Sequence, residues 1–205
     1  MSVFFNELNT MLSIPYEEYF SDMDLTPQEI KKRTSLAENI EEVMLFIFAL
    51  LSVMRQHGYI NKDYAVSELK RQYMDIAKQY VTIDNYIENY INRFSEEIID
   101  TTLRHIDEEW YLSNDRSMLI AENESNSAFN HYDYVKAVKS GKTRKMWLTE
   151  RDDRVRKTHQ EVNGIRIPIN EPFVVGNSLL LYPKDETYNP EPEQVMGCRC
   201  TVKYF

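Results

Sequence analysis

The stretch that decides the fold is the last quarter of the chain, from Trp147 to Cys200. It opens with the segment WLTERDDRVRKTH at residues 147–159, contains the segment LYPKD at residues 181–185, and closes with Cys198-Arg199-Cys200. Both cysteines of the chain and one of its two tryptophans fall here. No segment upstream is as rich in side chains that can bind metal, transfer protons or form ion pairs.

The order of these residues resembles the C-terminal part of the phage Mu F-like head morphogenesis family, the minor capsid proteins of tailed phages. An upstream segment, Ala121–Glu124, also resembles a family element, so the resemblance covers about residues 115–205. Two positions depart from the family pattern, because Gly197 stands where the family has Asn and Glu122 stands where it has Arg. The matching positions are Trp147, Thr149, Asp153, Arg154, Arg156, His159, Gly164, Phe173, Pro183, Asp185, Cys198, Arg199 and Cys200.

The resemblance implies a structural protein of the virion rather than an enzyme. Family members associate with the portal protein and other head proteins during head assembly, are present in few copies, and can touch the packaged DNA. We therefore expect a protein of a phage or prophage that is located in the head interior or at the portal vertex. The expected structural constellation consists of Glu124, Trp147, Asp153, Arg154, Arg156, His159, Asp185, Cys198, Arg199 and Cys200.

Charge divides the chain into two parts. Its 205 residues carry a net charge of −9, and 42% of them are hydrophobic, as in an ordinary globular protein. Residues 140–205 hold 11 basic and 9 acidic residues, whereas residues 1–139 hold 13 basic and 24 acidic ones, a net of −11. An acidic front and a mildly basic back suggest two partners with different surfaces.

The apolar and cysteine patterns favour an intracellular protein without a membrane anchor. The first residues lack a basic leader and a cleavage site, which argues against a signal peptide. The longest apolar run, Val43–Leu51, has nine residues, well short of the roughly 20 that span a bilayer. Two cysteines separated by one residue do not make a secreted disulfide framework.

Four helices are expected between residues 26 and 140. Thr26-Pro27-Gln28-Glu29 has the residues of a capping box, and apolar residues at three- and four-residue spacing continue that helix to about Gln56. Leu45, Phe46 and Phe48 fall off this apolar face, so a neighbouring subunit or the protein's own core should cover them. The other helices are expected at about residues 62–80, 83–109 and 116–140, and the last should pack against the C-terminal part.

The expected fold class is α+β, with an N-terminal bundle of long helices followed by a small C-terminal α+β module with short strands. Residues 1–25 form an N-terminal arm of a short helix and an extended segment, residues 26–140 the helical region, and residues 141–205 the module. Alternation predicts strands at 145–149, 165–167 and 200–204, and residues 151–161 are expected to form one short helix. The helical region should fold and associate without the module.

His159, Cys198 and Cys200 are the side chains best suited to metal binding. Thiolates and imidazole are good zinc ligands, but a structural zinc site usually has four, and Asp153, Asp185 or His131 would have to supply the last. We therefore expect no tightly bound cofactor, with the cysteines as small buried hydrophobes and His159 hydrogen-bonded to a carboxylate. Zinc binding and redox or nucleophilic chemistry remain the alternatives.

Six basic residues lie between Arg144 and Lys157, interleaved with three acidic ones. If residues 151–161 are helical, Asp152 pairs with Arg156 and Asp153 with Lys157 one turn away. We favour such internal ion pairs over DNA contact, which would be non-specific and sensitive to salt. The candidate nucleic-acid contacts are Arg144, Lys145, Arg151 and Lys157.

A second function class remains open from the sequence. Asp153, His159, Cys198 and Cys200 could form the site of a small enzyme or a toxin-like effector, since a thiolate beside an imidazole is a nucleophile when a third group orients the base. No oxyanion site and no phosphate-binding loop are evident from the spacing. The structural role is therefore the expected one.

Overall fold

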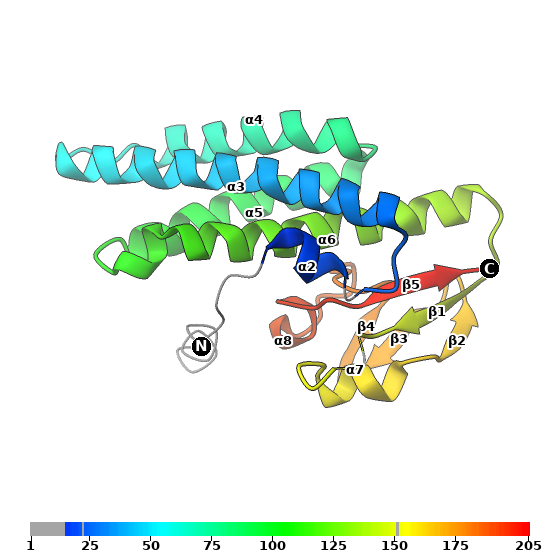
Figure 1. Cartoon of the computed structure of the whole chain (residues 1–205). Coiled ribbons are helices and arrows are strands. Elements are labelled where there is room, and N and C mark those ends of the chain that lie inside the picture. The colour runs from blue at the N-terminus through cyan, green and yellow to red at the C-terminus, as the bar shows by residue number, and fades with distance from the viewer. Residues whose placement is uncertain (1–14, 22, 151) are drawn as a thin grey trace.

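The computed structural model describes residues 15–21, 23–150 and 152–205. The long helices α3 (Pro27–Gln56), α4 (Lys62–Tyr80), α5 (Asn85–Arg104) and α6 (Asn114–Lys139) lie side by side, and a small strand-containing module lies against α6 (Figure 1). The predicted α+β class is confirmed. Among the described helices, none is both long enough and apolar enough to cross a membrane.

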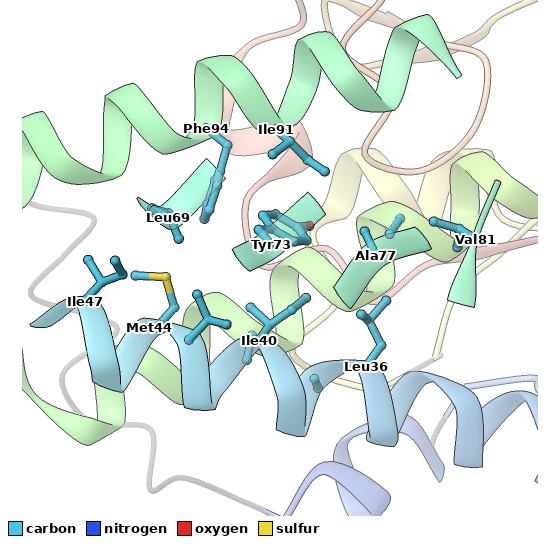
Figure 2. Packing of buried hydrophobic residues seen from close by; sticks show 14 of the residues in the cluster. Leu36, Ile40, Met44, Ile47, Leu69, Tyr73, Ala77, Val81, Ile91 and Phe94 are labelled. Carbon is cyan, nitrogen blue, oxygen red and sulfur yellow. The ribbon is translucent and has the colours of Figure 1, made fainter. Parts of the chain in front are cut away.

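Helix α3 begins as the sequence predicts. The Thr26 side chain accepts a hydrogen bond from the Glu29 backbone N–H, and the Glu29 carboxylate accepts one from the Thr26 N–H, which completes the capping box. Its apolar face carries Leu36, Ile40, Met44 and Ile47, which point toward Leu69, Tyr73 and Ala77 of α4 and toward Ile91 and Phe94 of α5 (Figure 2). Helix α6 adds Ala121, Ala128 and Phe129 to the same cluster and packs along α3, so all four long helices make the interior of the bundle.

The three residues that lie outside the apolar face of α3 differ in how far they are buried. Phe48 is buried, with the guanidinium of Arg116 over its ring at 5.0 Å. Phe46 is 46% exposed and Leu45 is partly exposed. The protein's own core thus covers Phe48 but leaves Phe46 accessible.

The third predicted helix ends earlier than expected. Helix α5 stops at Arg104, and a short 3-10 helix, η1 (Glu109–Leu112), precedes α6. Arg55 of α3 donates a hydrogen bond to the Ile106 carbonyl oxygen at 2.8 Å, which holds the turn between α5 and η1. A tertiary contact therefore ends α5 where the local sequence would let it continue.

The N-terminal arm is only partly described, because residues 1–14 and 22 lie outside the described residues. Helix α2 (Tyr16–Ser21) lies in this arm, for which the sequence predicted one short helix and then an extended segment. Tyr16, Tyr19 and Phe20 are buried against the helical core. Burial of these three aromatic side chains holds the described part of the arm on the bundle.

The module contains a three-stranded antiparallel sheet of order β2-β1-β5, formed by β1 (Arg144–Leu148), β2 (Arg166–Pro168) and β5 (Thr201–Tyr204). These strands match the three predicted ones within about a residue. A second pair, β3 (Phe173–Val175) and β4 (Ser178–Leu180), was not predicted. Its tight turn contains Gly176 at φ +58°, where a Cβ would lie 3.1 Å from a methyl group of Thr158.

The predicted helix at residues 151–161 is wrong in its first half. Helix α7 (Lys157–Val162) begins only at Lys157, and residues 152–155 form a turn, while residue 151 lies outside the described part of the chain. The other short helix of the module, α8 (Pro192–Val195), lies just before the cysteines. Because residues 152–155 form a turn, Asp152 pairs with Arg199 in the last loop instead of with a residue one helical turn away.

Two separate hydrophobic clusters divide the molecule. The larger one fills the helical bundle, and the smaller one surrounds Trp147, Phe173 and Leu180 in the module. The buried polar residues of α6 lie between the helical layer and the module, among them Glu124, Asn126, Asn130 and His131. The helical layer and the module therefore meet through hydrogen bonds and through ring contacts of Tyr182 with Tyr86 and Tyr134, without a shared apolar cluster.

Candidate functional site

Helix α6 holds the cysteine-containing loop through two asparagines one turn apart. The Asn126 amide donates to the Cys198 carbonyl oxygen at 3.0 Å, and the Asn130 amide donates to the Cys200 carbonyl oxygen at 3.2 Å and to that of Pro183 at 3.3 Å. Four residues of helix rise about 6 Å and two residues of extended chain rise about 6.6 Å, so the two spacings match. The prediction that this helix packs against the C-terminal module is confirmed.

A chain of hydrogen-bonded polar side chains, called the relay below, lies beside these two asparagines. The Glu124 carboxylate accepts hydrogen bonds from the hydroxyls of Tyr90 at 2.9 Å and Tyr73 at 3.1 Å, and from the Asn123 amide at 3.0 Å. The Lys184 ammonium donates to the side-chain oxygen of Asn123 and, at 3.0 Å, to the Val195 carbonyl oxygen. Glu124 and Lys184 are both about 2% exposed, so the relay joins a buried acid of α6 to a buried base of the module.

The environment shifts the pKa values of both ends of this relay toward the neutral forms. Burial raises the pKa of Glu124, although its hydrogen bonds and Lys184 oppose the shift. Burial lowers the pKa of Lys184 to about 8, although the thiol of Cys198 and the carboxyl of Glu124 oppose it. Hydrogen bonds from Tyr90 and Asn123 favour the charged form of Glu124 more than Lys184 does, and Cys198 favours the charged form of Lys184 more than Glu124 does.

His159, Cys198 and Cys200 come together, as the sequence suggested. Nδ1 of His159 lies 3.4 Å from the sulfur of Cys200 and 3.6 Å from that of Cys198, and all three residues are at most 3% exposed. The carboxylate expected beside His159 is absent from its hydrogen bonds, because Nε2 lies 3.2 Å from the amide oxygen of Gln194. That oxygen also accepts from the Thr158 hydroxyl at 2.9 Å.

The two thiols are free rather than joined, and they titrate as a pair. Burial alone would raise the pKa of Cys198, but hydrogen bonds to Cys200 and His159 and the positive Lys184 lower it well below its ordinary value. The hydrogen bond to Cys198 and burial raise the pKa of Cys200 well above its ordinary value. One proton therefore leaves the pair easily and the second leaves with difficulty.

Asp152, rather than Asp153, is the carboxylate that organises the arginines of this segment. Asp152 lies 3.1 Å from Nε of Arg154 and 2.5 Å from a guanidinium nitrogen of Arg199. Asp153 is exposed and does not belong to the cluster of His159 and the two cysteines. The predicted helical pairing of Asp152 with Arg156 does not form, because Arg156 instead donates to the Met196 carbonyl oxygen at 2.5 Å.

Two further predicted residues act as framework. Asp185 is fully buried and accepts hydrogen bonds from the backbone N–H groups of Leu181 at 2.8 Å and Thr187 at 3.0 Å, so it fixes the LYPKD turn. Trp147 is fully buried and meets the rings of Phe173 at 5.2 Å and His159 at 5.6 Å edge-on. It is the centre of the module's apolar cluster.

The candidate nucleic-acid contacts do not share one surface. Arg144 and Lys157 are exposed, and Arg151 lies outside the described residues. Lys145 is wrong as a DNA contact, because it is fully buried, donates to the Leu181 carbonyl oxygen at 2.6 Å, and has a pKa lowered to about 8 by burial. Its ammonium lies 5.2 Å from the centre of the Phe173 ring, which favours its positive charge.

Sequence reasoning missed three partners that hold the site, namely the partly buried Asn123 and the buried Lys184 and Gln194. All three are polar residue types that ordinarily face solvent, and no periodicity marks them as partners of the site. A signal did exist for Lys145, since it stands two residues from Trp147 on one strand and therefore shares its face.

Glu122, which departs from the family pattern, is buried near Arg154 and Arg199. Burial raises its pKa from 4.5 to about 7, although both arginines oppose the shift. A carboxyl whose pKa is raised by folding stabilises the folded state below its unfolded pKa of 4.5, and this contribution is lost as the pH rises through about 7. We therefore expect Glu122→Gln to be more stable than the natural protein at pH 8, by roughly 2–3 kcal/mol.

Urea unfolding between pH 5 and pH 8 measures this effect. The difference between the two proteins should grow with pH, whereas Glu42→Gln, which changes an exposed glutamate of α3, should follow the natural protein throughout. Parallel stability curves for all three proteins would show that Glu122 does not carry the pH dependence.

Comparison with known protein families gives a match to the family described as Phage Mu protein F like protein, over residues 67–203. The match begins inside α4 and ends inside β5, so it extends further upstream than the resemblance noted from the sequence, and it covers more than half of the chain. No curated protein and no solved structure matches the chain.

Proposed function

The chain belongs to the phage Mu protein F like family, and on this premise we propose that it is a minor structural protein of the phage head that assembles at the portal vertex. The family is one of phage head morphogenesis, which gives the structural role and the location in the virion. To this role we add that the chain associates with the portal and is present in few copies.

One observation carries the structural interpretation beyond the family match. Several of the residues that resemble the family motif fill the interior of the module or fix its loops, although Asp153 is exposed. His159, Cys198 and Cys200 are at most 3% exposed, and Asp185 is fully buried. A substrate could not reach these side chains without local unfolding, which supports a framework over the alternative of a small enzyme or toxin-like effector.

The outer end of the α3–α4 hairpin is the surface that we assign to the portal. Val53, Tyr59, Ile60 and Tyr64 are between 41% and 68% exposed there, at the end of the bundle far from the module (Figure 1). Exposed aromatic and aliphatic side chains gathered at one end are typical of a protein interface. We call these four residues the hairpin tip.

Co-expression with the portal protein encoded beside this chain tests the proposal. Affinity purification of tagged portal protein should recover the natural chain in a stable complex. The double variant Val53→Ser/Tyr59→Ser should lose most of this recovery, whereas Val174→Ser, at a 65% exposed position on β3, should keep it. Absence of any complex would contradict portal association, and full recovery of the double variant would remove the hairpin tip from it.

DNA contact is a weaker part of the proposal. We expect the isolated protein to bind duplex DNA poorly at physiological salt, because the helical front carries a net charge of −11 and phosphate binding depends on counterion release. Burial of the acidic front against a partner would present the mildly basic module to the head interior. Lys145 takes no part in this surface.

Charge reversal at Arg154 and Arg156 should harm folding more than DNA affinity. Arg154 pairs with Asp152 inside the turn, and Arg156 donates to the Met196 carbonyl oxygen, so the double Glu variant loses one link within the turn and one link to the final loop. We expect a lower melting temperature and little change in DNA affinity measured by fluorescence anisotropy. Arg144→Glu reverses the charge of an exposed candidate DNA contact and is the comparison for folding, because it should keep the melting temperature of the natural protein. A stable double variant that loses only DNA binding would contradict this assignment.

A further inference from the structure

We propose that His159, Cys198 and Cys200 bind one Zn²⁺ ion in the interior of the module. The sequence favoured no bound metal, because it offered three donors at an unusual spacing. The structure adds that Nδ1 of His159 and the two sulfurs all lie within 4.8 Å of one another. This inference is independent of the proposed role at the portal.

The distances fit a metal centre. Zn–N bonds of about 2.0–2.1 Å and Zn–S bonds of about 2.3 Å at tetrahedral angles place a nitrogen and a sulfur ligand roughly 3.5–3.6 Å apart. The separations of Nδ1 from the two sulfurs are 3.4 Å and 3.6 Å. A neutral imidazole nitrogen has one lone pair and accepts one S–H hydrogen bond well. Two sulfurs at nearly equal distances therefore suit a shared ion better than two competing thiols.

The surroundings prepare His159 to be a ligand. The amide oxygen of Gln194 can only accept, so Nε2 of His159 carries the proton and Nδ1 keeps its lone pair toward the sulfurs. The Thr158 hydroxyl holds that oxygen from the other side at 2.9 Å. An outer hydrogen bond of this kind fixes the tautomer and orientation of metal-binding histidines. The edge of Trp147 closes one side of the ring.

Hydrogen bonds also fix the backbone of the cysteine loop. Asn126 and Asn130 fix the carbonyl oxygens of Cys198 and Cys200 on α6, so the sulfurs are positioned before a metal binds. This support compensates for the Cys-x-Cys spacing. A ligand set prepared in advance loses less conformational entropy on binding.

Charge and ligand type favour zinc over harder ions. Two thiolates neutralise one Zn²⁺, so the loaded centre adds no net charge to a buried position. Sulfur ligands select zinc or another thiophilic metal over Mg²⁺ and Ca²⁺. The described residues supply three protein donors to this centre.

Metal analysis of the full chain, purified without chelator, tests the proposal. We expect inductively coupled plasma mass spectrometry to find one zinc ion per chain. Protein stripped of metal should take up one Co²⁺ with a sulfur-to-cobalt charge-transfer band and the strong visible absorption of a tetrahedral site. Zinc should raise the melting temperature of the stripped natural protein, which keeps the test valid even if a variant unfolds.

Variants locate the metal. Cys198→Ser and His159→Gln should lose the metal and the response of the melting temperature to zinc. His131→Gln, which changes another buried histidine that bonds Tyr182 and Asp84, should keep one zinc per chain. A folded natural protein that takes up neither zinc nor cobalt would overturn the proposal, and so would a different metal bound at the same residues.

Discussion

Replacing Glu124 with leucine should lower the free energy of unfolding by about 3–5 kcal/mol, because it removes a buried acceptor of three hydrogen bonds and a negative charge near the buried Lys184. The change leaves the Lys184 ammonium inside the protein without its acidic neighbour and takes the acceptor from the hydroxyls of Tyr73 and Tyr90. Urea unfolding followed by far-UV circular dichroism at pH 7 measures the effect.

A second substitution isolates the role of charge. In the double variant Glu124→Leu/Lys184→Met no ionisable group of the pair remains, so it should recover a large part of the lost stability. Such recovery is expected because two apolar residues of similar volume often replace a buried pair at little cost. A double variant that is no more stable than Glu124→Leu would show that Glu124 acts only through the tyrosines.

Trp147→Ala should be about as damaging, at about 3–5 kcal/mol. Trp147 is fully buried and packs edge-on against Phe173 and His159. The module's apolar cluster is small and separate from that of the bundle, so its neighbours cannot fill the cavity from elsewhere. The near-UV circular dichroism should change together with the loss of stability.

The matched control for Trp147 lies on β3, beside Phe173. Val174 is 65% exposed, so Val174→Ala should change the stability by no more than about 0.5 kcal/mol. If Trp147→Ala were equally mild, the module would not depend on its own apolar centre, and the hydrogen bonds to α6 would have to hold it.

The long helices could be predicted because each carries its own local evidence. The helix at residues 62–80 was predicted at both ends, and the Thr26 capping box was predicted to its partner Glu29. The end of α5 could not be predicted, because a hydrogen bond from Arg55 on α3 holds the turn that follows it. Strands β3 and β4 have three residues each, too few for alternation to separate them from loop.

Site residues of scarce types could be predicted from the sequence, whereas site residues of common types could not. Cysteine and histidine are scarce in this chain, so His159, Cys198 and Cys200 could be selected before their contact was known. Lys184 is one of many basic residues, and its burial depends on partners from both α6 and the last loop. Asp153 was preferred to Asp152 because it stands at the position of the family's Asp, whereas in the structure Asp152 is the one that pairs with Arg199.

The sequence also underestimated how strongly α6 belongs to the module. The helical region and the module were placed on either side of residue 140, yet α6 supplies the hydrogen bonds that hold the cysteine loop and the relay to Lys184. We still expect residues 26–140 to fold alone, since their apolar cluster is complete without the module. The module, by contrast, should need α6.

Quantitative mass spectrometry of purified phage heads tests the central claim most directly. The account predicts that this chain is present in DNA-filled heads in a small number of copies relative to the major capsid protein, and that heads lacking the portal protein also lack it. Heads that contain no copies of the chain, or that contain as many copies as of the major capsid protein, would contradict a minor structural role at the portal vertex.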